Sequence, residues 1–149
     1  MSSKGFEFAY MLDGSNATPV IRDFTLGAAA AHLVGDLMLM QSDGYIDAVT
    51  GSTTEVTCIM QEALAAADVT AGTTKGKAAI ITRNQVWRCS MDAATTTAVV
   101  GNTKTIDTVD KNTIDADDLS NGAMILVDTG TDDEGNVLAY VVFADTSFG

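Results

Sequence analysis

The stretch HLVGDLMLMQSDGYIDA, residues 32–48, consists of two short apolar runs separated by a turn. Gly35-Asp36 precedes the first run, Leu37–Met40, and Gln41–Gly44 supplies residue types that tolerate a left-handed backbone. Tyr45-Ile46 then resumes an extended pattern. The stretch predicts a β-hairpin, and the remaining chain follows the same design of short extended runs between turns.

Period-two alternation of apolar and polar residues predicts further strands at 20–26 and 54–61. We expect 78–83 and 86–91 to form a second hairpin around Asn84-Gln85. A third hairpin is expected from 123–127 and 137–144, joined by the polar loop 128–136. Residues 137–144 are apolar on both faces, which predicts that this strand is covered on both sides.

Three segments fit helix as well as other structures. The run Gly27–Ala31 predicts a turn or a single helical turn, because it is too short for an isolated helix. Residues 62–67 either prolong the preceding strand or become helical. Residues 115–122 begin with acids and end in Asn-Gly, which predicts one short capped helix. The fold expected is therefore all-β with at most one or two short helices.

Residues 1–19 are expected to form an extended N-terminal arm, followed by a single β-rich domain over 20–149. Phe6, Phe8 and Tyr10 alternate before a turn-forming segment that ends at Pro19. Such a segment forms either an edge strand of the domain's own sheet or a projecting arm that pairs with another copy. The candidate interface residues are Phe6, Phe8, Tyr10 and Met11.

The charge balance excludes several partners. Eight Lys and Arg against twenty Asp and Glu give a formal charge of -12, which repels nucleic acid and anionic membranes. No apolar run approaches the roughly 18 to 20 residues of a membrane-spanning helix, and the N-terminus lacks the apolar core of a secretory signal. We expect a soluble protein made in the cytoplasm.

The apolar balance of the chain suggests that part of its surface is covered. Only 19% of the residues are charged, although the protein is expected to be soluble. Mean hydropathy is +0.17. One interpretation is contact between subunits. The other is an ordinary surface rich in Ala and Thr, because Ala raises hydropathy without forming a patch.

Side chains suited to catalysis are scarce. His32 is the only histidine and is interpreted as structural or surface-exposed. Cys58 and Cys89 lie in apolar strand-like runs outside any nucleophile motif, and a disulfide requires that those strands be neighbours. Trp87 shares a strand face with Cys89 and Met91 and is expected in the core. We predict no catalytic residue, no cofactor and no enzymatic activity.

An acidic loop resembles a cation site only in composition. Asp128, Asp132, Asp133 and Glu134 are the oxygen-bearing residues that calcium prefers. They lack the order of acids, and the late bidentate Glu, of the calcium-binding helix-loop-helix. We therefore predict a solvated loop without a metal.

The segment 24–91 resembles the small capsid decoration, or cement, proteins of tailed bacteriophages. The resemblance covers slightly under half of the chain and departs from the family at Ile59-Met60, where members often have Gly. It depends on the following ordered features: Phe24-Thr-Leu, an Ala-rich turn, Gly35-Asp36-Leu37-Met38-Leu39, Asp43-Gly44-Tyr45-Ile46, Met60-Gln61-Glu62-Ala63, a Gly/Thr loop, Lys77-Ala-Ala-Ile-Ile81 and Val86-Trp87.

The resemblance implies a compact β-barrel or β-tulip-like domain of short antiparallel strands. It also implies an oligomer, with a trimer favoured over a dimer, that binds the major capsid protein on the outer surface of the virion and stabilises the shell. The alternatives are another phage structural component, such as a tail or head-fibre base protein, and a receptor- or carbohydrate-binding β-domain. For the last, Tyr45 and Tyr140 are the candidate exposed aromatics.

Overall fold

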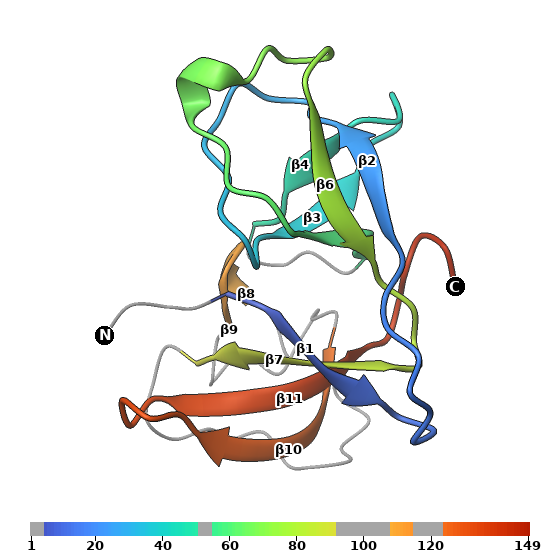
Figure 1. Cartoon of the computed structure of the whole chain (residues 1–149), viewed down its shortest axis with the longest axis vertical. Helices are drawn as coiled ribbons and strands as arrows, with labels where there is room; N and C mark the ends of the chain where they lie inside the picture. Colours follow the sequence, from blue (N-terminus) through green and yellow to red (C-terminus); the bar gives the residue numbers. More distant parts are fainter. Residues whose placement is uncertain (1–4, 51–54, 92–107, 115–123) are drawn as a thin grey trace.

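The computed structural model describes residues 5–50, 55–91, 108–114 and 124–149. The strands form two antiparallel sheets and one small two-stranded sheet (Figure 1). The four-stranded sheet has the order β1 (Glu7–Met11), β7 (Gln85–Ser90), β11 (Val137–Phe143), β10 (Met124–Thr131). The five-stranded sheet has the order β2 (Ile21–Thr25), β6 (Lys75–Ile80), β5 (Cys58–Met60), β3 (Leu37–Met40), β4 (Ile46–Ala48). The small sheet pairs β8 (Thr108–Asp110) with β9 (Thr113–Ile114), and η1 (Ala66–Asp68) is a single 3-10 turn.

The two large sheets lie one above the other, and their strands run crosswise (Figure 1). The main core lies between them and receives Trp87 and Val141 from the four-stranded sheet and Leu37 and Ile59 from the five-stranded sheet. These side chains are almost completely buried, as expected of apolar residues that alternate along a strand. The all-β class is confirmed. Within the described residues the sheets remain separate, so a closed barrel is not shown.

The middle of the five-stranded sheet is buried on both faces. A second core on its far face contains Leu26, Met38 and Met60, and it is covered by the segment that contributes Leu64 and Val69. All residues of β5 are therefore buried, although the strand is short. The five-stranded sheet therefore lies between the two cores and contributes side chains to both.

The first predicted hairpin is confirmed as β3–β4, with Leu39 opposite Asp47. Its turn is closed by a hydrogen bond of 2.8 Å from the Gln41 amide to the Tyr45 carbonyl. Gly44 has φ +84°, which is the left-handed conformation that the turn requires. The residues Gly27–Ala31 form a turn without helix.

The predicted hairpin of 78–83 with 86–91 is wrong. Both strands exist, but β6 pairs with β2 and β5 in one sheet, whereas β7 pairs with β1 and β11 in the other. The chain therefore turns a corner between the sheets at residues 81–84. Trp87, Cys89 and Met91 do face the core, as predicted.

The third hairpin is confirmed as β10–β11, with a bulge between Leu126 and Asp128. The prediction that residues 137–144 are covered on both sides is confirmed for one face only. Val141 and Phe143 are buried between the sheets. On the opposite face Leu138 is buried, whereas Tyr140 and Val142 are half-buried.

Residues 7–11 form the edge strand β1 of the chain's own four-stranded sheet, with Glu7 opposite Arg88. A projecting N-terminal arm is not confirmed. The alternative interpretation, an edge strand of the domain's own sheet, accounts for the alternating aromatics. The predicted helix at 115–122 lies outside the described residues, and within them no helix is long and apolar enough to cross a membrane.

The C-terminal tail is fastened to the body of the fold. Thr146 forms a parallel bridge with Val56, just before β5, and the Ser147 amide donates to the Val56 carbonyl at 3.0 Å. The Thr57 and Ser147 hydroxyls are 2.7 Å apart, and the Arg83 amide lies 3.4 Å from the Gly149 carbonyl. The tail thereby contacts both the segment just before β5 and the corner between the sheets.

Candidate binding surface

The candidate interface residues of the N-terminal strand have different environments. Phe6 is buried in the main core, 5.7 Å from the Phe143 ring centroid. Phe8 is half-buried and packs edge-on against Trp87, with 5.6 Å between ring centroids. Met11 is half-buried, and Tyr10, 44% exposed, is the most open of the four. The structure thus leaves Tyr10 as the main surface aromatic of this strand.

A larger apolar surface lies elsewhere, where two Ala-rich segments meet. The backbones of His32 and Leu64 pair through two hydrogen bonds of 2.9 Å, which bring the loop before β3 beside the segment that leads to η1 (Figure 1). We call the exposed apolar residues of these two segments the alanine face. They are Ala28, Ala29, Ala30, Ala31, Leu33, Val34, Ala63, Ala65, Ala66 and Ala67.

The alanine face carries no charge of its own. Residues 24–35 and 63–67 contain no Asp, Glu, Lys or Arg, although the chain as a whole has a formal charge of -12. Leu33 and Val34, which are consecutive in the sequence, are 58% and 54% exposed. Contiguous exposed apolar surface of this kind marks interaction sites.

This surface is not evident from the sequence alone. Gly27–Ala31 and 62–67 are separate segments of the sequence, and only the pairing of His32 with Leu64 brings the two together. The available signal was the pair of charge-free segments in an acidic chain, together with the apolar balance that first suggested subunit contact.

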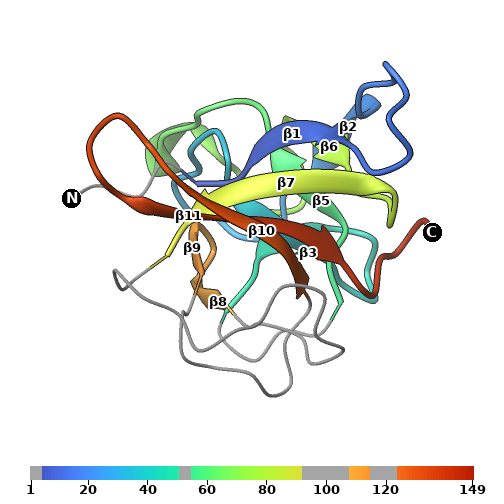
Figure 2. The ribbon, with the colours of Figure 1, turned by 90° about the horizontal axis from the view of Figure 1, so that it is seen from below.

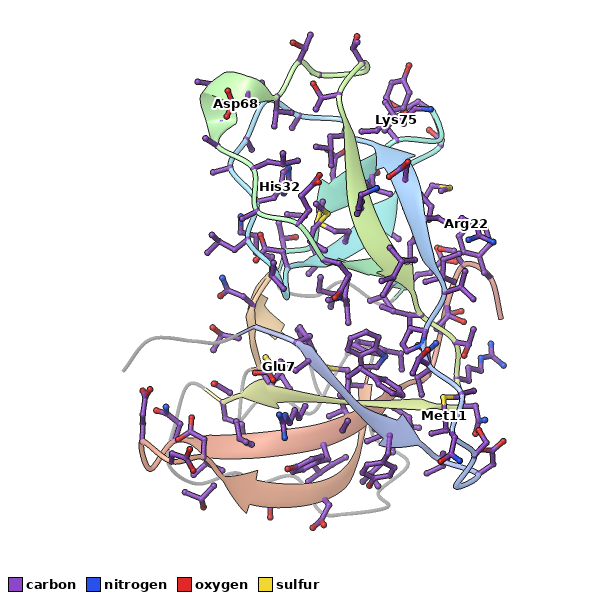
Figure 3. All side chains as sticks on the ribbon, in the orientation of Figure 1. Glu7, Met11, Arg22, His32, Asp68 and Lys75 are labelled. Atoms are coloured by element: carbon purple, nitrogen blue, oxygen red, sulfur yellow. The ribbon has the colours of Figure 1, made fainter. Side chains whose placement is uncertain are left out.

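A buried polar cluster supports the face from below. His32, which is labelled in Figure 3, is 3% exposed, and its neighbour in the cluster, Asp36, is fully buried. Lys111 Nζ lies 3.1 Å from Asp36 Oδ2 and 3.0 Å from the Ala31 carbonyl, and the Leu37 amide donates to the Lys111 carbonyl at 2.7 Å. The loop between β8 and β9 is thereby tied to the base of the alanine face.

His32 is held neutral by its surroundings. Burial, and then the positive charge of Lys111, lower the pKa of His32 below its ordinary value of 6.5, against the opposing effects of Asp36 and Asp47. Neither ring nitrogen has a hydrogen-bond partner among the described residues. His32 is accordingly a buried structural residue, and no nucleophile accompanies it in the described cluster.

The two cysteines are buried and form no disulfide with each other, and Cys89 Sγ donates to the Asn112 carbonyl at 3.3 Å. Cys58 belongs to the core on the far face of the five-stranded sheet and Cys89 to the core between the sheets. Burial raises the pKa of the Cys58 thiol to about 12, so it is not ionised near neutral pH.

The acidic loop is held together by hydrogen bonds among its own residues. Asp132 Oδ1 accepts hydrogen bonds from the amides of Glu134 and Asn136 at 2.9 and 2.8 Å, and Oδ2 accepts from the Asn136 side chain at 2.9 Å. Asp132 therefore shapes the β10–β11 turn. Within the described residues no group of three or more His, Cys, Asp or Glu side chains is placed to hold a metal.

Comparison of the chain with protein-family models and with curated proteins gives no match.

Proposed function

We propose that this protein is a capsid decoration protein that binds the outer surface of a phage head and stabilises the shell. The observation that carries the proposal is the alanine face. It is an exposed, charge-free apolar surface on an otherwise acidic protein. A surface of this kind is suited to a permanent contact with another protein. The ordered features of residues 24–91 that resemble decoration proteins include one of its two segments and border the other.

The core and the ion pair behind the alanine face suit a protein that stabilises a shell. The alanine face is backed by the second core and by the Asp36–Lys111 ion pair, so its backbone is fixed by hydrogen bonds rather than carried on a free loop. A rigid apolar surface loses little conformational entropy on docking, which favours tight binding. The major capsid protein is the partner proposed for this surface.

The proposal is tested by adding the purified protein to isolated heads of the virus that encodes it. We expect binding to saturate at a fixed number of copies per head and to raise the temperature at which the heads are disrupted. Quantitative gel analysis of sedimented heads measures occupancy, and calorimetry measures the disruption temperature. Heads that take up no protein would contradict the proposal.

Two matched variants place the contact. Leu33→Asp puts a carboxylate in the alanine face and is expected to reduce occupancy by at least about tenfold, since a charge buried at an interface without a partner is costly. Ser42→Asp adds the same charge in the exposed β3–β4 turn and is expected to bind as the parent does. Equal binding of both variants would remove the alanine face from the proposal.

A further inference from the structure

The outer face of the four-stranded sheet carries an ordered row of polar side chains. Strand pairing places Glu7 opposite Arg88, Arg88 opposite Tyr140, and Tyr140 opposite Asp128. Directly opposite residues project from the same face of a sheet, so the row crosses all of its strands. The neighbouring residue Trp87 projects into the core, which puts this row on the outside. Figure 2 shows the strands of the four-stranded sheet from this outer side.

Arg88 is held in position within this row. Its Nη2 donates to Glu7 Oε2 at 3.1 Å, and hydrogen bonds to Glu7 and to the Tyr140 side chain raise the pKa of Arg88. The Arg88 and Glu7 side chains remain 42% and 46% exposed. A guanidinium has several donors, so one ion pair leaves others for a ligand.

The Tyr140 ring lies against the neighbouring strand β10 at Gly130. A Cβ atom at Gly130 would lie 3.1 Å from Tyr140 Cε2, so the absence of a side chain at Gly130 makes room for the ring. The Tyr140 ring thus covers backbone, and Tyr10 on β1 supplies a second, 44% exposed ring. Tyr45 was the other candidate aromatic for a carbohydrate-binding site. It packs near Gly72, on the side of the five-stranded sheet.

These residues line a hollow of about 560 Å³ that reaches from β1 to β10 and contains Tyr10, Arg88, Asp128 and Tyr140 in its wall. A second hollow of about 280 Å³ shares Arg88, Thr131 and Tyr140 with it. The Arg88–Tyr140 pair therefore stands between two adjoining depressions. Together they have the size of a site for a small or extended ligand.

We propose that this face binds a neutral oligosaccharide. The two tyrosine rings offer apolar surface for the carbon-bound faces of sugar rings, and their hydroxyls add polar groups beside it. Arg88 and Asp128 offer a donor and an acceptor for neighbouring sugar hydroxyls. The extended shape of the paired hollows suits several sugar units in a row. This proposal does not depend on the alanine face or on capsid binding.

The charges of the site select against other ligands. The acids along the two hollows, Glu7, Asp128, Asp132 and Asp133, outnumber Arg88, which disfavours phosphorylated or acidic glycans. The polar wall disfavours lipids. A cationic peptide would also be favoured by the acidic side chains, but it does not need two tyrosine rings in the wall of the hollow, so it is the competing ligand in the experiment.

The test uses the full chain on an array of neutral, sialylated and sulfated glycans, with titration calorimetry of the neutral glycans bound. An oligolysine peptide is titrated in parallel. We expect neutral glycans to bind, Tyr140→Ala to weaken binding by about tenfold, and Tyr45→Ala to leave binding unchanged. Thermal melting of both variants checks that they are folded.

A second variant separates the site from the stability of the sheet. Arg88→Met keeps much of the aliphatic stem but removes every donor, and it is expected to weaken glycan binding while Trp87 fluorescence stays that of the parent. The proposal is overturned if no neutral glycan binds, if Tyr140→Ala binds as the parent does, or if oligolysine alone binds.

Discussion

His32 is a buried imidazole whose neutral form is the one that fits the fold. Its ring lies beneath the alanine face, near Asp36, Asp47 and Lys111, and neither ring nitrogen has a partner among the described residues. Protonation would add a second positive charge beside Lys111 in a buried site. The sole histidine of the chain thus makes stability depend on pH.

Acidification is expected to destabilise the protein through His32. The pKa of His32 in the folded protein lies below its ordinary value of 6.5, so its contribution to stability is complete above that pH. The contribution is lost as the pH falls through the lowered folded pKa, because the unfolded chain then binds the proton more readily. His32→Gln is expected to show a smaller loss of unfolding free energy between pH 7 and pH 5.

Urea unfolding of both proteins at several pH values measures this difference. Carboxylates also titrate at the lower end of the range, but they are common to both proteins and cancel in the comparison. Parallel pH profiles for the parent and the His32 variant would contradict the prediction.

At the scale of elements, the corner between β6 and β7 depends on one side chain. Gln85 Oε1 accepts hydrogen bonds from the Thr82 amide and from Trp87 Nε1, each at 3.1 Å, and its Nε2 donates to the Ile80 carbonyl at 3.1 Å. Gln85 is only 4% exposed. The amide ties the end of one sheet to the beginning of the other.

Replacement of Gln85 by Leu is expected to destabilise the protein by roughly 2–4 kcal/mol, because buried donors and an acceptor lose their partner. Gln41→Leu, in the exposed β3–β4 turn, is the matched control and is expected to change stability by less than about 0.5 kcal/mol. Urea denaturation followed by Trp87 fluorescence compares them. Similar unfolding midpoints for both variants would refute this role of Gln85.

The corner between β6 and β7 also shows which features of the fold could be predicted from the sequence and which could not. Alternation identified both strands and the core-facing side of Trp87, since that pattern is local. The partners of β6 and β7 depend on contacts with β2 and β11, which are distant in sequence, so two strands joined by a short turn were misassigned as a hairpin. The β3–β4 hairpin was predicted correctly because Asp43-Gly44 specifies its turn locally.

The candidate surfaces were harder to predict than the strands. The alternation of Phe6, Phe8 and Tyr10 is the same for a projecting arm and for an edge strand, and only the fold places Phe6 in the core. The polar row that includes Arg88 and Tyr140 joins residues from separate strands through their register. Register across a sheet is not encoded in any single segment.

At the scale of the whole molecule, apolar residues also lie exposed along the open edge of the five-stranded sheet. Val20 and Ile21 are 49% and 50% exposed, and Phe148, 52% exposed, packs 6.4 Å from the Phe24 ring. This group lies at β2, apart from the alanine face (Figure 1). The expected homo-oligomer requires a contact surface separate from the one proposed for the capsid.

Ile21→Asp is expected to shift the protein from an oligomer, with a trimer favoured, to a monomer, because it places a charge on this edge. Leu33→Asp, in the alanine face, is expected to leave the oligomer intact. Light scattering coupled to gel filtration measures the mass of both variants. A monomeric parent protein, or an oligomer abolished only by Leu33→Asp, would contradict this assignment.

The fastening of the C-terminal tail has a mechanical consequence. Tension applied at Gly149 reaches the tail's parallel bridge between Thr146 and Val56, and from there β5, the middle strand of the five-stranded sheet. The parallel arrangement loads the bonds of the tail together in shear instead of opening them one at a time. A pull on Gly149 is therefore resisted by bonds to the segment that leads into β5, a strand that is fully buried.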